Sequence, residues 1–268
     1  MKLSMLCALA IVGVAAAQDS SERTSVPFSD PSRPGTLKVA LIQGSILVKG
    51  GDVKAVIIET RGAPDRFAPH EAEGAGGLHR LPQQPAISVD EQDNRITIGS
   101  PNPGRAMDLE IEVPRRTNLA LSTVNQGVIR VEGVDGEIEV GDVNGSITLS
   151  DVSGSVVAHT INGNVTATIA RASPQKPMAF ASLNGAIDVT LPASIKANLK
   201  LRSDNGDIHT DFDVHTLPPP SRAVEDTRRS DGRHRIEVNK AIYGSVNGGG
   251  AEIELRTFNG SVYVRKGG

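Results

Sequence analysis

Apolar and polar positions repeat with a period of nine residues through the middle of the chain. Glycines stand nine residues apart at Gly127, Gly136, Gly145, Gly154 and Gly163. After each glycine, the second and fourth places hold Ile, Val, Leu or Ala, and the seventh place holds Val, Ile or Ala. Repetition at a short fixed period is typical of stacked repeat architectures. The pattern predicts an all-β chain of short, similar strands.

Two arrangements of these strands compete. Asn-Gly or Asp-Gly between apolar strands is a strong hairpin signal, which would give an antiparallel sandwich. A two-residue hairpin at Asn144-Gly145, however, would place Val143 and Ile147 on opposite faces of the sheet. If the chain instead turns a corner at each glycine, two units make one coil, and residues one coil apart stack at about 4.8 Å. The sequence therefore favours a parallel β-helix, or β-solenoid, and leaves the sandwich as the alternative.

The coil arrangement predicts which side chains are stacked inside. Residues eighteen apart should form continuous aliphatic columns across neighbouring coils. Three such columns are expected, containing Ile129, Ile147 and Val165 in the first, Ile138 and Val156 in the second, and Val131, Leu149 and Ala167 in the third.

The same unit recurs outside the central block, so one domain is predicted over residues 35–268. Further copies open at Gly35, Gly44, Gly185, Gly206 and Gly260. Segments rich in Gly and Pro interrupt the copies at about 62–86 and 217–235, and these are interpreted as surface insertions. No ordinary helix is expected beyond the N-terminus, because apolar residues nowhere recur at a sustained 3.6 period.

The N-terminus predicts export. Lys2, an apolar run from Leu3 to Val14, and small residues at Ala15 and Ala17 are typical of a secretory signal peptide over residues 1–17, too short to span a membrane. Residues 18–34 are expected to be disordered. The exported chain would be periplasmic, associated with the cell envelope or secreted. Because Cys7 is the sole cysteine, the mature chain has no disulfide, and stacked aliphatic columns must provide its stability.

Residues suited to catalysis or metal binding are few. Glu137 and Glu139 point outward from one predicted strand, about 7 Å apart, a separation seen in inverting glycosidases. A solvated face is the better interpretation, because Ser155 and Val157, stacked above them, offer no catalytic partner. The six histidines are scattered without ligand spacing. No enzyme activity, cofactor or metal is predicted, and the net charge of −3 argues against nucleic acid as a partner.

A binding role is best placed in the second insertion. Arginine can grip carboxylates in pairs and is enriched at binding hot spots. Five arginines lie in or beside the Pro-rich segment after Leu217, and they are the candidate partner-binding residues: Arg222, Arg228, Arg229, Arg233 and Arg235. A solvated loop without a partner is the alternative interpretation.

Several segments together resemble the bacterial putative-adhesin family. They are the run Asp108–Pro114, the Asn-Gly corners at Asn144, Asn162 and Asn184, and the closing Asn247-Gly248-Gly249-Gly250 and Asn259-Gly260 segments. The family consists of domains of unknown function with β-strand repeats, and the likeness covers about residues 35–266. It implies a β-solenoid in the cell envelope and transfers no catalytic residue.

The sequence thus predicts a non-enzymatic envelope or surface protein with an adhesin-like or scaffolding role. Its partner would be a protein or polymer of the envelope or surface. A polysaccharide-active β-helix enzyme and a self-assembling structural protein are the alternatives. An exposed carboxylate cluster with aromatic platforms would favour the enzyme, and uncapped terminal coils would favour assembly.

Overall fold

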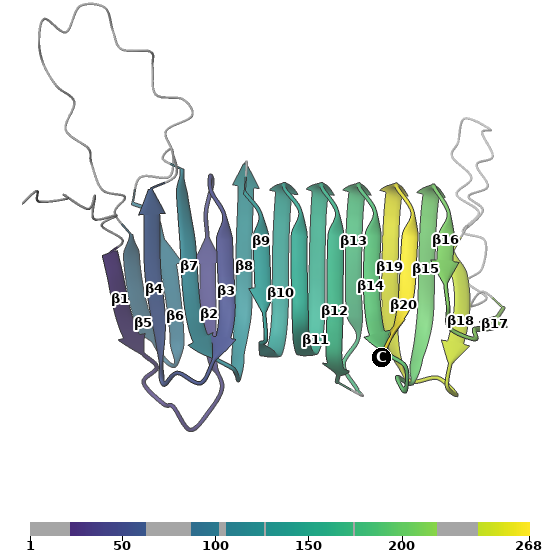
Figure 1. The fold of residues 1–268 in the computed structure, drawn as a ribbon, viewed down its shortest axis with the longest axis horizontal. Helices are drawn as coiled ribbons and strands as arrows, with labels where there is room; N and C mark the ends of the chain where they lie inside the picture. The colour runs from purple at the N-terminus through teal and green to yellow at the C-terminus, as the bar shows by residue number, and fades with distance from the viewer. Residues whose placement is uncertain (1–21, 63–86, 102–105, 126, 174, 219–240) are drawn as a thin grey trace, which may run out of the picture.

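A computed structural model describes residues 22–62, 87–101, 106–125, 127–173, 175–218 and 241–268. Within these ranges the chain forms twenty strands of one mixed sheet and no helix, which confirms the all-β prediction. The sheet is folded into two rows of strands that lie against each other along the long axis (Figure 1). Aliphatic side chains from both rows fill one continuous core.

Row A and row B are defined by their pairing. In spatial order, row A contains β5 (Ser88–Gln92), β6 (Arg95–Gly99), β2 (Gly35–Ala40), β8 (Thr117–Asn125), β10 (Asp135–Asn144), the second half of β11 (Ile147–Asn162), β13 (Met178–Asn184), β19 (Ala251–Asn259), β15 (Ala197–Asn205), β18 (Ile242–Val246) and β17 (His215–Leu217). Row B contains β1 (Glu22–Pro27), β4 (Ala55–Gly62), β7 (Met107–Pro114), β3 (Ile46–Gly51), β9 (Ile129–Glu132), the first half of β11, β12 (Val165–Ala172), β14 (Ile187–Pro192), β20 (Val262–Gly267) and β16 (Ile208–Thr210).

The predicted stacking of residues eighteen apart is confirmed in the central strands. Ile147 pairs in parallel register with Ile129 on one side and Val165 on the other, and all three are fully buried. Ile138 likewise stacks on Val156. The third column holds Val131, Leu149 and Ala167 in the same way. Neighbouring coils therefore share unbroken aliphatic columns, which is how a chain without disulfides builds its core.

The two ends of the sheet correct the expectation of a wholly parallel β-helix. β4 pairs antiparallel with β1 and β7, and β5 pairs antiparallel with β6. At the other end, β18 pairs antiparallel with β15 and β17. Antiparallel strands need only short connections, so they can close an end where no further coil follows. They also protect the parallel edges, which would otherwise be templates for strand addition.

The spatial order of the coils differs from their order in the sequence. The pair β2 and β3 lies between β6–β7 and β8–β9, and the pair β19 and β20 lies between β13–β14 and β15–β16. Towards one end of the molecule, the strands near the N-terminus, β2 and β3, are thus enclosed between later strands. Towards the other end, the last two strands, β19 and β20, are enclosed between earlier ones. The looser spacing of the outer glycines gave no indication of this order.

The seventh place of the repeat points in two different directions, which the sequence did not predict. Val134 and Val152 are buried, whereas Ile161 is 43% exposed and Val143 is half-buried. The residue before the exposed member points inward instead: Asp142 and Thr160 are buried. The two corners of each coil are thus chemically distinct, and consecutive nine-residue units are not equivalent.

The segment 18–34 was expected to be disordered, but part of it forms a strand. Residues 22–27 make β1, which pairs with β4 over six residues from Glu22–Thr60 to Pro27–Ala55. Phe28 then covers the end of the core and is 7% exposed. The domain therefore begins before residue 35. The proposed signal peptide, residues 1–17, lies outside the described residues.

Glycine is required at the corners because successive coils approach there through their backbones. A Cβ atom on Gly145 would lie 1.8 Å from the carbonyl oxygen of Gly127. We expect Gly145→Ala to lower the free energy of unfolding by about 1–3 kcal/mol, since backbone and not a movable side chain must shift. Gly99→Ala is the control, because its Cβ would meet only the Ser88 hydroxyl at 3.4 Å. Equal urea midpoints for the two variants would contradict the close approach.

Candidate interaction surface

A ladder of asparagine side chains runs along the corner between row A and row B. Five of its six amide nitrogens donate to the amide oxygen of an asparagine on the neighbouring coil, at 2.7–3.1 Å. The six members in spatial order are Asn125, Asn144, Asn162, Asn184, Asn259 and Asn205. We call this row the asparagine ladder. It explains why five of these six corners read Asn-Gly: the asparagine amide joins the ladder, and the glycine leaves room for the backbone of the adjacent coil.

A buried row of hydroxyl groups lies inside the same corner, two residues before the ladder. Each hydroxyl donates to the carbonyl oxygen of the corner glycine on the adjacent coil. The five donors are Thr123, Thr160, Ser182, Thr257 and Ser203, at 2.8–3.2 Å. This row satisfies backbone carbonyls that would otherwise be buried without a donor.

Asp142 occupies the hydroxyl position on its coil. It is in register with Thr123, is 2% exposed, and neither carboxylate oxygen has a well-formed hydrogen bond. Burial raises the pKa of Asp142 to about 6, although the backbone N–H groups of Val143 and Asn144 act in the opposite direction. Only the protonated acid can do what a hydroxyl does here, namely donate to a carbonyl oxygen such as that of Gly127.

Between the hydroxyl row and the asparagine ladder, the residues on β8, β10, β11, β13 and β19 point outward and are apolar, whereas Asp204 holds this place on β15. Ile42, before the Gln43–Asn125 bridge, continues the apolar line after β2. The register of these apolar residues follows from the pairing of their neighbours, and they form a line along row A: Ile42, Val124, Val143, Ile161, Leu183 and Phe258. Leu183 is 47% exposed and Phe258 is 48% exposed. We call this line the apolar ridge. Six strands at about 4.8 Å spacing make it about 24 Å long.

A row of smaller residues lies beside the ridge, further from the corner. It contains Ala40, Ser122, Gly141, His159 and Ala181, and we call it the trough. The largest member lies flat, because a Cβ atom on Gly141 would come within 2.8 Å of the His159 Nε2 atom. Gly141 thus makes room for the imidazole. No member of the ridge or the trough from β2 to β13 is charged.

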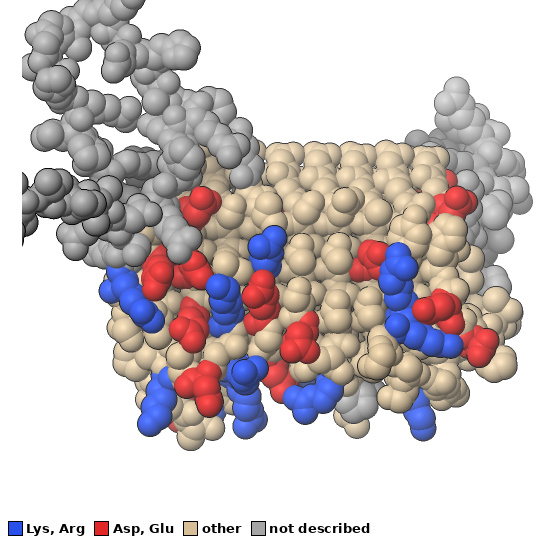
Figure 2. Space-filling view, viewed as in Figure 1, with Lys and Arg blue, Asp and Glu red and all other residues tan. Residues whose placement is uncertain are grey.

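The charged side chains gather elsewhere. One broad face of the molecule shows acidic and basic groups interspersed toward both ends, while the upper border over the central strands carries none (Figure 2). Many of these charges neutralise each other: Lys49 pairs with Glu110 at 2.7 Å, and Arg265 pairs with Asp188 at 2.8 Å. His209 stacks on Tyr263 with ring centroids 5.1 Å apart.

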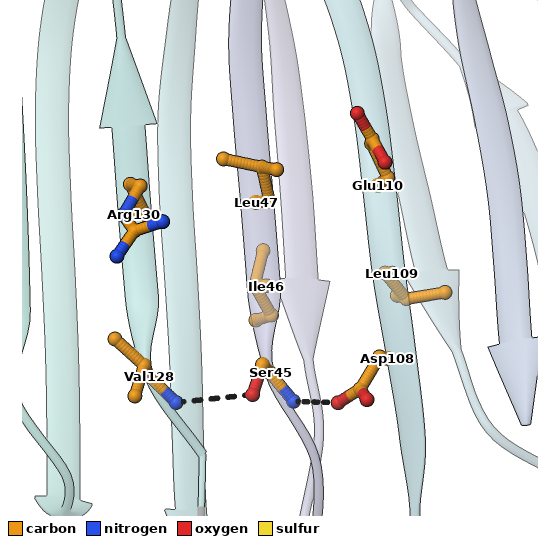
Figure 3. A pocket seen from close by; sticks show the side chains of 8 residues that line it. All are labelled: Ser45, Ile46, Leu47, Asp108, Leu109, Glu110, Val128 and Arg130. Carbon is orange, nitrogen blue, oxygen red and sulfur yellow. Dashed lines mark hydrogen bonds between the residues drawn. The ribbon is translucent and has the colours of Figure 1, made fainter. Parts of the chain in front are cut away.

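A shallow hollow lies on row B, over β7, β3 and β9 (Figure 3). Its volume is about 250 Å³, and Leu47 stands in it between Glu110 and Arg130. Ligand pockets usually exceed about 300 Å³. The carboxylate of Asp108 is engaged, because it accepts a hydrogen bond from the Ser45 backbone N–H at 2.9 Å. The hollow therefore has structural polar groups and no convergent set for catalysis.

The structure describes only some of the candidate site residues that the sequence analysis named. Arg222, Arg228, Arg229, Arg233 and Arg235 lie outside the described residues, as does most of each insertion. Glu137 forms an ion pair with Lys176, and Glu139 is flanked by Ala120 and Val157. Among the described residues, no three His, Cys, Asp or Glu side chains are grouped to hold a metal ion.

The apolar ridge was missed at the sequence level because Val143 and Ile147 were required to lie on the same face of the sheet, which would make the seventh place internal. A signal was present. The motif Ser/Thr/Asp, apolar, Asn, Gly occurs at Val143, Ile161, Leu183 and Phe258. Strand alternation around an inward hydroxyl places the next residue outside.

No protein-family model and no curated protein matches this chain in sequence. Among solved structures, it is similar to a putative cell adhesion protein from Clostridium sporogenes, with 11% identity, a TM-score of 0.50, and coverage of 92% of this chain and 100% of that one. A putative adhesin from Bacteroides fragilis shares 11% identity over 95% of this chain and 100% of that one, with a TM-score of 0.28. A putative lipid binding protein from Parabacteroides distasonis shares 9% identity over 94% of this chain and 98% of that one, with a TM-score of 0.32. The Clostridium likeness concerns the fold alone.

No helix in the described part of the chain has the length and apolar character needed to cross a membrane.

Proposed function

We propose that this chain is a non-enzymatic, exported protein of the cell envelope or surface, built as a β-solenoid with an adhesin-like or scaffolding role. The parallel stacking of the central coils supports the solenoid description. The observation that carries the function is the apolar ridge, since a broad uncharged strip on an otherwise charged surface is typical of a contact site.

The dimensions of the strip support this role. The ridge and trough together cover about 300–400 Å², which is within the range of the largest apolar patches on soluble proteins, and such patches are often functional. The strip is also rigid, because hydrogen-bonded strands hold all ridge residues except Ile42, which lies in a bend after β2. A preorganised surface loses little conformational entropy on binding.

Export is proposed from the sequence of residues 1–17, and a catalytic role is not proposed. Glu137 is neutralised by Lys176, and in the described part of the chain Glu139 is flanked by Ala120 and Val157, so the two carboxylates lack the shared partners of a catalytic pair. General acid–base catalysis needs such a partner at hydrogen-bonding distance from the reacting groups.

The proposal is tested by binding to intact cells of the producing bacterium. We expect the labelled exported chain to bind saturably, and the double variant Ile161→Lys/Leu183→Lys to bind at least about tenfold more weakly, because it buries two charges in the contact. Thr166→Lys/Thr168→Lys adds the same charge on β12 of row B, where both residues are exposed, and should bind like the wild type.

Equal binding by both double variants would contradict the role of the ridge. Release of new reducing ends from envelope polysaccharide by the wild type, abolished in Glu139→Gln, would support the enzyme instead. Protease treatment of intact cells that leaves the chain untouched would argue against surface display.

A further inference from the structure

The apolar ridge and the trough are parallel lines with the same spacing. Each ridge residue stands two positions after a trough residue on the same strand, as Leu183 stands after Ala181. A contact with two-fold symmetry must use a surface that complements itself. A two-fold axis running between the two lines, parallel to both, places the ridge of one copy over the trough of the other.

The trough can accept a ridge because its members are small or flat. Ser122, Gly141 and Ala181 have short side chains or none, and the His159 ring lies over Gly141. Two sheets that pack face to face lie about 10 Å apart with interdigitated side chains. Valine, isoleucine and leucine on one copy would pack on alanine, serine and the flat His159 imidazole of the other.

The same arrangement gives the polar border a partner. Beyond the trough lies a row containing Ala120, Glu139, Val157 and Ala179, and the axis places this row opposite the asparagine ladder of the other copy. Five ladder amides donate one N–H to the neighbouring asparagine, and Asn144 gives its second N–H to the Val124 carbonyl oxygen at 3.3 Å. In the contact this second N–H would exchange that carbonyl oxygen for the Glu139 carboxylate of the other copy. Lys38 on β2 lies at one end of this row, and Arg256 on β19 follows Ala181 in the trough at the other end of the surface.

We propose that the partner of this surface is a second copy of the chain, with the apolar ridge of each copy seated in the trough of the other. This inference rests on the proposed function and names its partner. An aromatic-stacking polymer such as a polysaccharide fits less well, because Phe258 is the one aromatic member of the ridge and stands at its end. A membrane surface fits less well too, since the central part of the ridge and trough has no basic residue.

The size of the contact sets its strength. The ridge, the trough and the rows beside them amount to about 500 Å² per copy, less than the roughly 800 Å² per partner of a standard stable interface. Single contacts between two copies are therefore weak. Many copies displayed together would hold through avidity, because each new contact forms at high effective concentration.

Sedimentation equilibrium of the exported chain tests self-association directly. We expect reversible dimers at concentrations above roughly 10–100 µM, given the small contact area. Ile161→Lys/Leu183→Lys should weaken dimerisation at least about tenfold without changing the melting temperature, because both residues are exposed. Thr166→Lys/Thr168→Lys should dimerise like the wild type. A wild type that stays monomeric up to about 1 mM, or equal dimerisation of all three proteins, overturns the proposal.

Cysteine cross-linking tests the arrangement, since the chain after residue 17 has no cysteine. Leu183→Cys mixed with Ala181→Cys should form a disulfide-linked dimer faster than either variant alone, because ridge faces trough. Faster linkage of Leu183→Cys with itself overturns the arrangement. Should the wild type prove monomeric yet still bind cells through the ridge, this inference fails and the proposed function stands. A wild type that dimerises but does not bind cells would leave this inference standing and contradict the proposed function.

Discussion

Replacing Asp142 with threonine should stabilise the protein above pH 6. Asp142 is the acidic member of a buried row of hydroxyl donors, and its own oxygens accept no well-formed hydrogen bond. Its pKa rises from the ordinary 3.8 to about 6 in the folded chain, a difference that corresponds to about 3 kcal/mol. We expect Asp142→Thr to raise the free energy of unfolding at pH 8 by up to about 3 kcal/mol, or about 5–10 °C in melting temperature.

The pH dependence has a definite sign. Between pH 3.8 and about 6 the folded chain keeps a proton on Asp142 that the unfolded chain has released. Wild-type stability therefore falls as the pH rises through this window, and the loss is complete above it. The difference between Asp142→Thr and wild type should be small at pH 3.5 and largest at pH 8.

Two further variants make the test specific. Asp142→Ala removes the carboxylate without supplying a donor, so it should gain about 1 kcal/mol less than Asp142→Thr. Asp90→Thr changes an exposed aspartate on β5 and should leave the pH profile of stability as in the wild type. A difference between Asp142→Thr and wild type that is constant from pH 3.5 to pH 8 would show that Asp142 keeps an ordinary pKa.

The second large effect is expected in the first aliphatic column. Ile147 is fully buried between Ile129 and Val165. Ile147→Asp would place an unpaired carboxylate in this stack, and we expect a loss of at least about 3 kcal/mol in the free energy of unfolding. Urea denaturation followed by circular dichroism measures it.

Thr148→Asp is the matched control, one residue further along β11. Thr148 points outward between Arg130 and Thr166, so an aspartate there meets water and a basic neighbour. We expect a change below about 1 kcal/mol. Equal losses for the two variants would contradict the assignment of inside and outside on this strand.

The central coils were predictable from the sequence because a strict period leaves little freedom. Gly127 to Gly163 repeat without insertion, so the register of the columns follows from the eighteen-residue spacing of Ile129, Ile147 and Val165. Excluding the hairpin by the faces of Val143 and Ile147 rested on a wrong premise, because Val143 points outward whereas Ile147 is buried. The ends were not predictable in this way. Antiparallel pairing of β4 with β7, or of β18 with β15, depends on which backbone edges remain open after the coils have formed, and no local pattern records that.

The candidate surface was predictable only in part, for a related reason. The apolar residue at the seventh place of the repeat points inward in some units and outward in others. It points outward where the residue before it is buried instead. Val134 turns inward, whereas Ile161 turns outward because the Thr160 hydroxyl donates to the carbonyl oxygen of Gly145 inside the corner. Polar satisfaction of the backbone thus decides the direction, and hydrophobicity alone predicts the wrong face.

The position of β19 and β20 constrains how the length of this protein can change during evolution. Because these last strands fill the layer between β13–β14 and β15–β16, the end of the chain cannot be extended or trimmed by one repeat without emptying or duplicating an interior layer. From β8 to β14, sequence order and spatial order agree. Tandem duplication or deletion of eighteen residues there, between Gly127 and Gly163, would preserve both closed ends. Relatives of different length should therefore differ in the number of these central coils.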